Sequence, residues 1–434
     1  MTDAGVTESE IFNSKKYKHS RNSYNIQCAF EHFINMLVSD AYLAKVLTEI
    51  GISDSVIGVI SSIMSLALLF QLASVFAVSK IKNVKKTVIV FNSASQVLFI
   101  SLYLIPSVRM SVKALTALAL LSRLCAYAFM YFVSNIHYKW SNSFVAPDKR
   151  ASFSAFKEMV SLMLGIIVSL AAGFMFDHFE ERGAIRTAFL IAFAVTAAFA
   201  LCNFICLMNI SKPDSPVAAE SFSFREIYKN TLGNRNFTSV VIMTSIFSVA
   251  TSMTNGFLGT FKTNDLLYSV GAVQLMNIAG YLSRFFVSMP LGRYSDKHTF
   301  AKGMKLGMVL QLISFVFVIF CTPSTRWCII AYTLISMISL AGTNQNSFSI
   351  IYSYVDSQYF VQAIAIKNCI NGAVGFIASL IAGKILDTVQ NNGNYIFGFH
   401  LYGQQFLAMI SVILTGVCII YISKVIEKQK VLLQ

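Results

Sequence analysis

The chain has 434 residues, of which 56% are hydrophobic and only 12% are charged, and its formal net charge is +14. Soluble domains carry about 25% charged residues, so this composition excludes a string of ordinary globular domains and favours an integral membrane protein.

Twelve apolar runs along the chain are long enough to cross a bilayer, whose hydrocarbon core takes about 20 helical residues. They lie near 26–46, 56–78, 87–105, 113–136, 153–175, 187–208, 239–261, 267–290, 304–320, 327–349, 363–385 and 401–422. Because no water is present in the core to satisfy backbone groups, each run is expected to be a helix. The sequence thus predicts an all-α membrane protein with twelve spans.

A polar segment divides these spans into two groups of six. Asn209–Asn236 contains Pro213, Pro216 and charges of both signs, and Ser221–Glu226 is expected to start a short surface helix. The expected divisions are an N-terminal tail (1–24), a six-helix bundle (25–210), a linker (211–235), a second six-helix bundle (236–424) and a C-terminal tail (425–434).

An internal repeat supports two halves built on one plan. Ala155–Asp177 and Ala365–Asp387 align at an offset of 210, with nine of 23 positions identical, including a Lys and the final Asp. Duplicated halves are common in secondary transporters, whose substrate site lies between the repeats.

The distribution of Lys and Arg predicts the orientation. With both ends in the cytoplasm, 22 of the 34 fall in cytoplasmic segments, six fall outside and six lie within spans. This bias is the positive-inside pattern. The basic charge is therefore interpreted as topology, and no nucleic-acid partner is expected.

The predicted loop between spans eight and nine, Pro290–Lys305, reads PLGRYSDKHTFAKGMK. It resembles the cytoplasmic loop motif of the major facilitator superfamily, in which a Gly is followed by an Asp and then by basic residues. Gly292, Asp296 and Lys297 occupy this pattern, whereas the loop at Phe76–Lys86 keeps only the basic residues. VAPDKRASFSAFK, at Val145–Lys157, also looks like that superfamily.

The resemblance covers the chain from about residue 25 and implies two pseudo-symmetric six-helix bundles that transport a solute by alternating access. It implies that spans 1, 4, 7 and 10 line the cavity. It also implies a gating role for Gly292, Asp296 and Lys297, with Asp296 as a latch of the cytoplasmic side.

Intramembrane charges in the first span are candidates for ion coupling, because charges inside spans are costly and usually functional. Gln27, Glu31, Asn35 and Ser39 recur every four residues and share one helical face. Glu31 is interpreted as a site of proton or cation coupling, with Asp40 as a second candidate. The alternative for Glu31 is a structural ion pair with a buried base, and the alternative for Asp40 is a packed helix face.

The fourth span carries Arg123, Tyr127, Tyr131 and Asn135 at the same spacing. The Arg123 guanidinium suits a carboxylate or phosphate bound through two hydrogen bonds. A salt bridge from Arg123 to Glu31 or Asp40 is the alternative. Neutral polar residues follow in spans seven and ten. The substrate-binding candidates are Asn35, Arg123, Tyr127, Tyr131, Ser248, Asn255, Thr343 and Asn346.

Hydrogen bonding between helices is the alternative for the neutral candidates. Lys157 and Lys367, near the cytoplasmic ends of their helices, and Arg284 are gating candidates, with snorkelling as the alternative for the lysines. Cys321 and Cys328 flank an external turn and are either free thiols or a pair. No cofactor or metal is expected.

The sequence thus favours a proton-coupled secondary active transporter of a small polar or amphipathic solute, with anionic and sugar-like solutes as candidates. The expected protein is a monomer in the cell membrane with both termini cytoplasmic. Multidrug efflux is the alternative within transport, and a transporter-like receptor or sensor is the alternative from another class. No clustered catalytic set suggests an enzyme. The sequence leaves open the substrate, import against export, and proton against sodium coupling or uniport.

Overall fold

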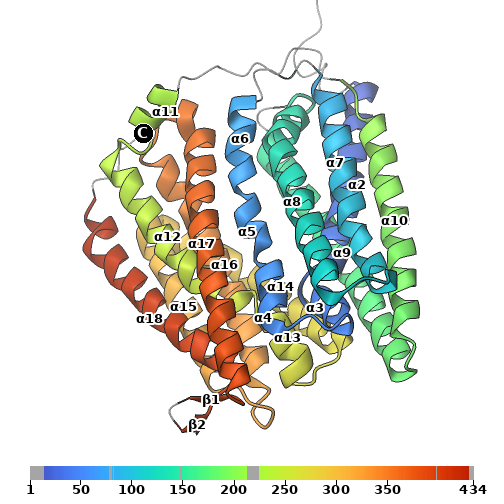
Figure 1. The fold of residues 1–434 in the computed structure, drawn as a ribbon. Helices are drawn as coiled ribbons and strands as arrows, with labels where there is room; N and C mark the ends of the chain where they lie inside the picture. The colour runs from blue at the N-terminus through green and yellow to red at the C-terminus, as the bar shows by residue number, and fades with distance from the viewer. Residues whose placement is uncertain are drawn as a thin grey trace, which may run out of the picture. The chain divides into compact units, whose positions relative to one another are not determined.

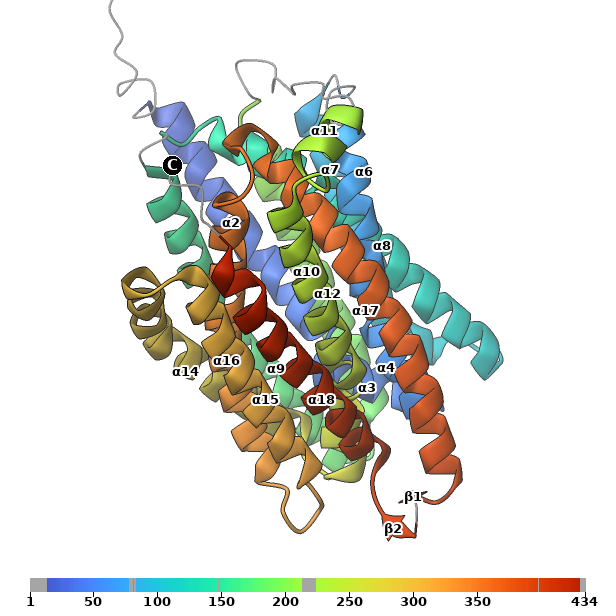
Figure 2. The ribbon, with the colours of Figure 1, turned by 90° about the vertical axis from the view of Figure 1, so that its left-hand side faces the viewer.

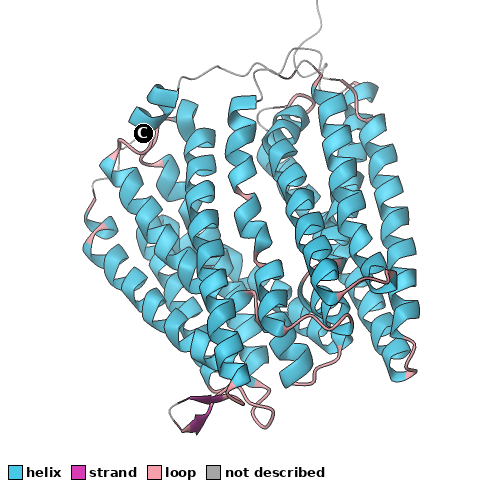
Figure 3. Cartoon of the chain, viewed as in Figure 1, coloured by secondary structure: helices cyan, strands magenta, loops and turns pink. Residues whose placement is uncertain are grey.

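The computed structural model describes residues 14–77, 81, 83–146, 149–212, 224–396 and 398–429. Almost every described residue with regular structure is helical, and a single two-residue strand pair stands out in Figure 3. The predicted linker segment 213–223, Lys80, Lys82 and Lys430 lie outside the described residues. The all-α class predicted from the apolar runs is confirmed.

The described residues of the first part of the chain, up to Lys212, form nine α-helices and one 3-10 helix (Figure 1). They are α2 (Lys15–Leu37), α3 (Asp40–Glu49), α4 (Asp54–Ser61), α5 (Ile63–Ala67), α6 (Leu69–Ala77), α7 (Val84–Ile100), η2 (Ser101–Ser107), α8 (Val112–Asn142), α9 (Arg150–Glu181) and α10 (Ile185–Asn209).

The rest of the described chain is also helical apart from one hairpin. Its elements are α11 (Phe224–Asn230), α12 (Arg235–Asn255), α13 (Leu258–Thr260), the π-helical turn η4 (Phe261–Asp265), α14 (Val270–Lys297), α15 (Phe300–Ile319), α16 (Cys328–Tyr352), η5 (Ser357–Tyr359), α17 (Phe360–Asn391), β1 (Tyr395–Ile396), β2 (Phe399–His400), α18 (Gly403–Lys424) and η6 (Ile426–Lys428).

Helix starts follow the side chains that can cap them. Ser111 caps α8, Asn234 caps α12 and Thr299 caps α15, each by accepting a hydrogen bond from a backbone N–H of the first turn. Such residues satisfy N–H groups that have no partner within the helix.

Cys321 and Cys328, which flank the turn between α15 and α16, are free and buried. Burial raises the pKa of the Cys321 thiol to about 12.

Ten stretches are long and apolar enough to cross a membrane among the described residues. The predicted spans at 26–46 and 267–290 are not among them, because α2 and α14 carry more polar residues. The predicted span at 26–46 is also interrupted, since α2 ends at Leu37 and α3 begins at Asp40. The count of twelve spans stays a prediction that agrees with this arrangement.

Contacts group the chain into two compact units. Unit 1 is Met1–Tyr42 with Phe70–Ser221, and unit 2 is Leu43–Leu69 with Phe222–Gln434. Within unit 2, α4 and α5 pack on α17. A Cβ at Gly372 of α17 would lie 2.2 Å from the Ser65 carbonyl oxygen, so only glycine permits this approach. The Ser55 hydroxyl also donates a hydrogen bond to the Asp387 carboxylate of α17.

The two units repeat the same internal pairings. In unit 1, α2 packs on α9 and α10, and α7 packs on α8; in unit 2, α12 packs on α17 and α18, and α15 packs on α16. Figure 2 shows α15, α16 and α18 running together in unit 2. Helices α9 and α17 are both 32 residues long, and both of their ends are displaced by the 210 residues of the sequence repeat.

Candidate functional site

A closed ring of side-chain hydrogen bonds surrounds Glu31 in unit 1. Gln27 Nε2 donates to Glu31 Oε2 at 2.7 Å and to Asn203 Oδ1 at 2.8 Å. Asn203 Nδ2 donates to Asn92 Oδ1 at 2.7 Å, and Asn92 Nδ2 returns to Glu31 Oε2 at 2.9 Å. The ring joins α2, α7 and α10, and its three amides are at most 1% exposed.

The carboxylate of Glu31 is bound in the ring by side-chain amides only. Glu31 forms no ion pair within the part of the chain that the structure describes, and both hydrogen bonds to it come from amide N–H groups. The structure therefore gives no support to a buried base as the partner of Glu31.

Sequence reasoning placed Gln27 and Glu31 on one face but missed Asn92 and Asn203. Asn203 is the single amide of its predicted apolar span, whereas Asn92 shares its span with Gln96, and all three are buried. An amide in such a run is a detectable signal, since a side chain of this kind needs a partner within the bundle. Nothing in the spacing of two separate helices, however, indicates that the two amides meet.

The other two candidates of the first span lie beyond the ring. Asn35 is half-buried, its Nδ2 lies 3.7 Å from Met130 Sδ, and its Oδ1 is buried without a hydrogen-bond partner among the described residues. Asp40 is the first residue of α3 and has a φ of 48°. An acid in the first turn interacts favourably with the helix dipole, and Asp tolerates the left-handed region better than most residues.

Arg123 closes the break between α2 and α3. It is 2% exposed, and its guanidinium donates to the carbonyl oxygen of Val38 and, at 3.1 Å, to the Tyr127 hydroxyl. Tyr103 donates to the neighbouring carbonyl of Leu37. Both carbonyls lie at the end of α2, where no helical N–H group reaches them. The described partners of Arg123 are thus a carbonyl and a tyrosine, and no carboxylate is among them.

The two tyrosines of the α8 face extend from this point. The Arg123 guanidinium carbon lies 5.3 Å from the centroid of the Tyr127 ring, which in turn stacks on Tyr131 at 6.2 Å. One turn further, Asn135 Nδ2 donates to Ser74 Oγ at 2.9 Å. Arg123, Tyr127 and Tyr131 therefore contact one another in sequence along α8, whereas Asn135 contacts α6.

The candidates on α12 make contacts between helices of unit 2. Ser248 Oγ donates to the Asn371 carbonyl of α17 at 2.8 Å, and Asn255 Oδ1 accepts from the Tyr332 hydroxyl of α16 at 2.8 Å. Asn371 Oδ1 also accepts from Ser245 at 2.9 Å. These bonds are of the kind that neutral polar side chains form in membrane bundles.

Thr343 and Asn346 of α16 face α15, where Gly303 and Gly307 form a small-residue motif of the GxxxG type. Both side chains are buried and donate to carbonyls of their own helix, Thr343 to Ser339 at 3.1 Å and Asn346 to Gly342 at 2.7 Å. A Cβ at Gly303 would lie 2.7 Å from Asn346 Nδ2. The structure therefore places these two candidates in a close helix contact.

The lysine candidates lie against aromatic rings. Lys157 Nζ lies 5.6 Å from the centroid of the Tyr24 ring. Lys367 is 8% exposed, and its Nζ donates to Ser347 Oγ at 3.3 Å and lies 5.4 Å from the centroid of the Phe348 ring. Lys367 has no acidic partner among the described residues. A cation over an aromatic face is stabilised by the ring, most strongly when it is desolvated.

The motif residues lie at the end of α14. The sequence placed them in a loop, but the helix continues to Lys297, so Gly292, Asp296 and Lys297 are all helical. Asp296 and Lys297 are exposed, and Arg284 is half-buried three turns earlier. A lysine in the last turn suits the helix dipole, whereas an aspartate there does not.

Comparison with known proteins agrees with this architecture. The family model of the Major Facilitator Superfamily matches residues 28–379. No curated protein gives a significant match to the sequence.

Several solved structures share the fold. The nucleoside transporter NupG superposes with a TM-score of 0.69 at 12% identity, covering 94% of this chain and 99% of that one. A bacterial homologue of the human lysosomal transporter Spinster gives 0.66 at 11% identity, covering 96% and 97%. A POT family transporter in complex with 5-aminolevulinic acid gives 0.66 at 12% identity, covering 93% and 96%.

At these identities the solved structures show the fold of this chain but do not identify its substrate. The shared fold agrees with the matching helix pairings in the two units of this chain. With a family model matched over most of its length, the chain belongs to the Major Facilitator Superfamily and is a multi-pass membrane transporter.

Proposed function

We propose that this chain is a proton-coupled secondary transporter of a small polar solute. Three lines of support are the superfamily fold, the polar solutes named for similar structures, which include nucleosides and 5-aminolevulinic acid, and the ring around Glu31. The two predicted bundles, 25–210 and 236–424, move against each other in alternating access.

The observation that carries the coupling is the pair of N–H groups on one oxygen of Glu31. A charged Glu31 Oε2 accepts hydrogen bonds from both Gln27 and Asn92. A proton on that oxygen turns it into a donor, so at least one of these amides must rotate or retreat. Because the ring joins α2, α7 and α10, protonation changes how these helices are held together. Asp40 is less favoured as the coupling group, since an acid in the first turn of α3 is explained by its favourable interaction with the helix dipole.

Replacing Glu31 with Gln tests the coupling. The purified protein is first screened by thermal shift against nucleosides, short peptides, sugars and sugar acids, and the best-binding solute is used in proteoliposomes. Glu31→Gln keeps the size of the side chain but cannot ionise. We expect accumulation driven by a pH gradient to fall to equilibration, whereas solute exchange continues, because exchange does not require release of the proton.

Glu181→Gln serves as the matched control, because Glu181 is an exposed acid at the end of α9. It removes the same charge from the same unit outside the ring. Undiminished gradient-driven accumulation in Glu31→Gln would reject Glu31 as the coupling group, and an equal loss in both variants would assign the effect to overall charge.

We also propose that both termini are cytoplasmic, in the cell membrane. The support is the excess of Lys and Arg in one set of loops. Reporter fusions at Lys430 and within 213–220 are expected to report the cytoplasm. A reporter signal from the opposite side of the membrane at either position would overturn this topology.

A further inference from the structure

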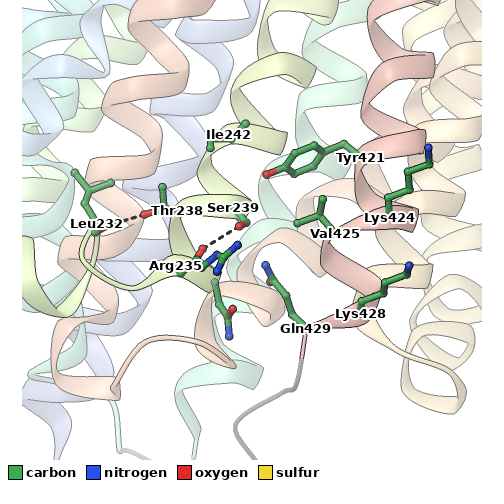
Figure 4. Close-up of a pocket in the computed structure, with 11 residues that line it drawn as sticks. Leu232, Arg235, Thr238, Ser239, Ile242, Tyr421, Lys424, Val425, Lys428 and Gln429 are labelled. Carbon is green, nitrogen blue, oxygen red and sulfur yellow. Dashed lines mark hydrogen bonds between the residues drawn. The ribbon is translucent and has the colours of Figure 1, made fainter.

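A cavity of about 800 Å³ lies at one end of unit 2, away from the ring and the candidates described above. It is formed by the start of α12, the end of α18 and η6 (Figure 4). Leu232, Ile242, Tyr421 and Val425 supply its apolar wall. Polar and apolar walls thus share one hollow at the end of two transmembrane helices.

The charged residues that line the cavity are all basic. They are Arg235 at the first position of α12, Lys424 in the last turn of α18, and Lys428 one turn further in η6. All three are exposed. In Figure 4 the Arg235 guanidinium and the two lysines come from opposite sides of the hollow. Both lysines line the same cavity although they belong to two different elements.

The one acid in this stretch does not balance the three cations. Glu427, between the two lysines, is paired with Lys305 of α15 at 2.9 Å and does not line the cavity. No acidic side chain lines it either, among the described residues. The start of α12 adds a partial positive charge from the helix dipole.

The threonine and serine hydroxyl groups in the wall are already used as donors. Thr238 Oγ1 donates to the Leu232 carbonyl at 2.7 Å, and Ser239 Oγ donates to the Arg235 carbonyl at 2.9 Å. The basic side chains are therefore the charged donors available to an occupant, beside the Tyr421 hydroxyl and the amides of Asn236 and Gln429. Their chemistry matches a phosphate group, which Arg binds through two hydrogen bonds and Lys as a point charge.

We propose that this cavity binds the headgroup of an anionic phospholipid. The phosphate lies among Arg235, Lys424 and Lys428, and the glycerol backbone lies along the apolar wall with Tyr421, an interfacial residue type. The predicted topology places these helix ends on the cytoplasmic side, whose leaflet carries the anionic lipids that attract basic segments. The proposal rests on the proposed topology but does not depend on the proposed solute or on Glu31.

Binding of short-chain lipids to the purified full chain in neutral detergent tests the proposal. Dihexanoyl phosphatidylglycerol is compared with dihexanoyl phosphatidylcholine and with inorganic phosphate. We expect the anionic lipid to bind most tightly and its affinity to fall with added salt. Lys424→Gln/Lys428→Gln is expected to weaken that binding about thirtyfold, which corresponds to about 2 kcal/mol at 1.4 kcal/mol per tenfold.

The matched control is Arg225→Gln/Lys229→Gln. Both residues are exposed on α11, belong to the same unit and do not line the cavity. Their substitution removes two positive charges, as the test variant does. Equal affinity for the two lipids would overturn the proposal, as would an equal loss of affinity in the control. Inorganic phosphate binding as tightly as phosphatidylglycerol would also overturn it, because the site would then recognise a free anion.

Discussion

Gly307→Ala tests whether the contact of α15 with α16 depends on the absence of a side chain. A Cβ on Gly307 would lie 2.9 Å from the Thr343 backbone nitrogen and 3.1 Å from the Ser339 carbonyl oxygen. Both neighbours are backbone atoms of α16, so neither can rotate away as a side chain would. Ser339 Oγ also donates to the Gly307 carbonyl at 2.7 Å. The new methyl group therefore has to push the two helices apart.

The expected cost follows from these contacts. Forcing an extra carbon into a packed interior costs about 1–3 kcal/mol. Weakening the Ser339 hydrogen bond adds about 0.6 kcal/mol, the average for such bonds in a membrane protein. Alanine recovers up to about 1 kcal/mol through its higher helix propensity. With the full gain in helix propensity subtracted, we expect Gly307→Ala to lower the free energy of unfolding by about 0.6–2.6 kcal/mol, measured by titrating the detergent-solubilised protein with sodium dodecyl sulfate.

Gly416→Ala is the matched control, because Gly416 lies in the interior of α18 and a Cβ there meets nothing within 4 Å. That variant should be unchanged or up to about 1 kcal/mol more stable. If Gly307→Ala is as stable as Gly416→Ala, the close packing of α15 on α16 does not stabilise the protein. The assignment of Thr343 and Asn346 to that contact would then lose its physical basis.

Two further predictions concern charged residues. Arg123→Lys keeps the charge but loses the planar guanidinium that donates to Val38 and Tyr127 together. We therefore expect the free energy of unfolding to fall by about 1.5–3 kcal/mol. Weaker solute binding at unchanged stability would instead identify Arg123 as a substrate ligand. The latch role that the superfamily resemblance implies for Asp296 predicts that Asp296→Asn shifts the population toward the inward-facing state. Cysteine accessibility at the predicted cytoplasmic ends of α8 and α16 would report the shift, and unchanged accessibility with a full transport rate would show that Asp296 is only a solvated charge.

Sequence alone determined the class of the protein and its internal duplication. Long apolar runs can satisfy their backbone groups in a membrane only as helices, so their number and spacing predict an all-α membrane fold. The 210-residue repeat predicted equivalent helices, and α9 and α17 are indeed equal in length at that offset. A period of four placed Gln27 and Glu31 on one face because helical geometry fixes neighbours within a helix.

Only the tertiary structure decided which side chains meet across helices. Asn92 and Asn203 join Glu31 from two other helices, and Arg123 reaches a carbonyl that is free only because the first span breaks at Val38. Thr343 and Asn346 lie against glycines of α15. Residue types and local periodicity specify the faces of single helices. The pairing of those faces depends on the packing of whole helices, since contacts between distant segments leave no regular spacing in one sequence.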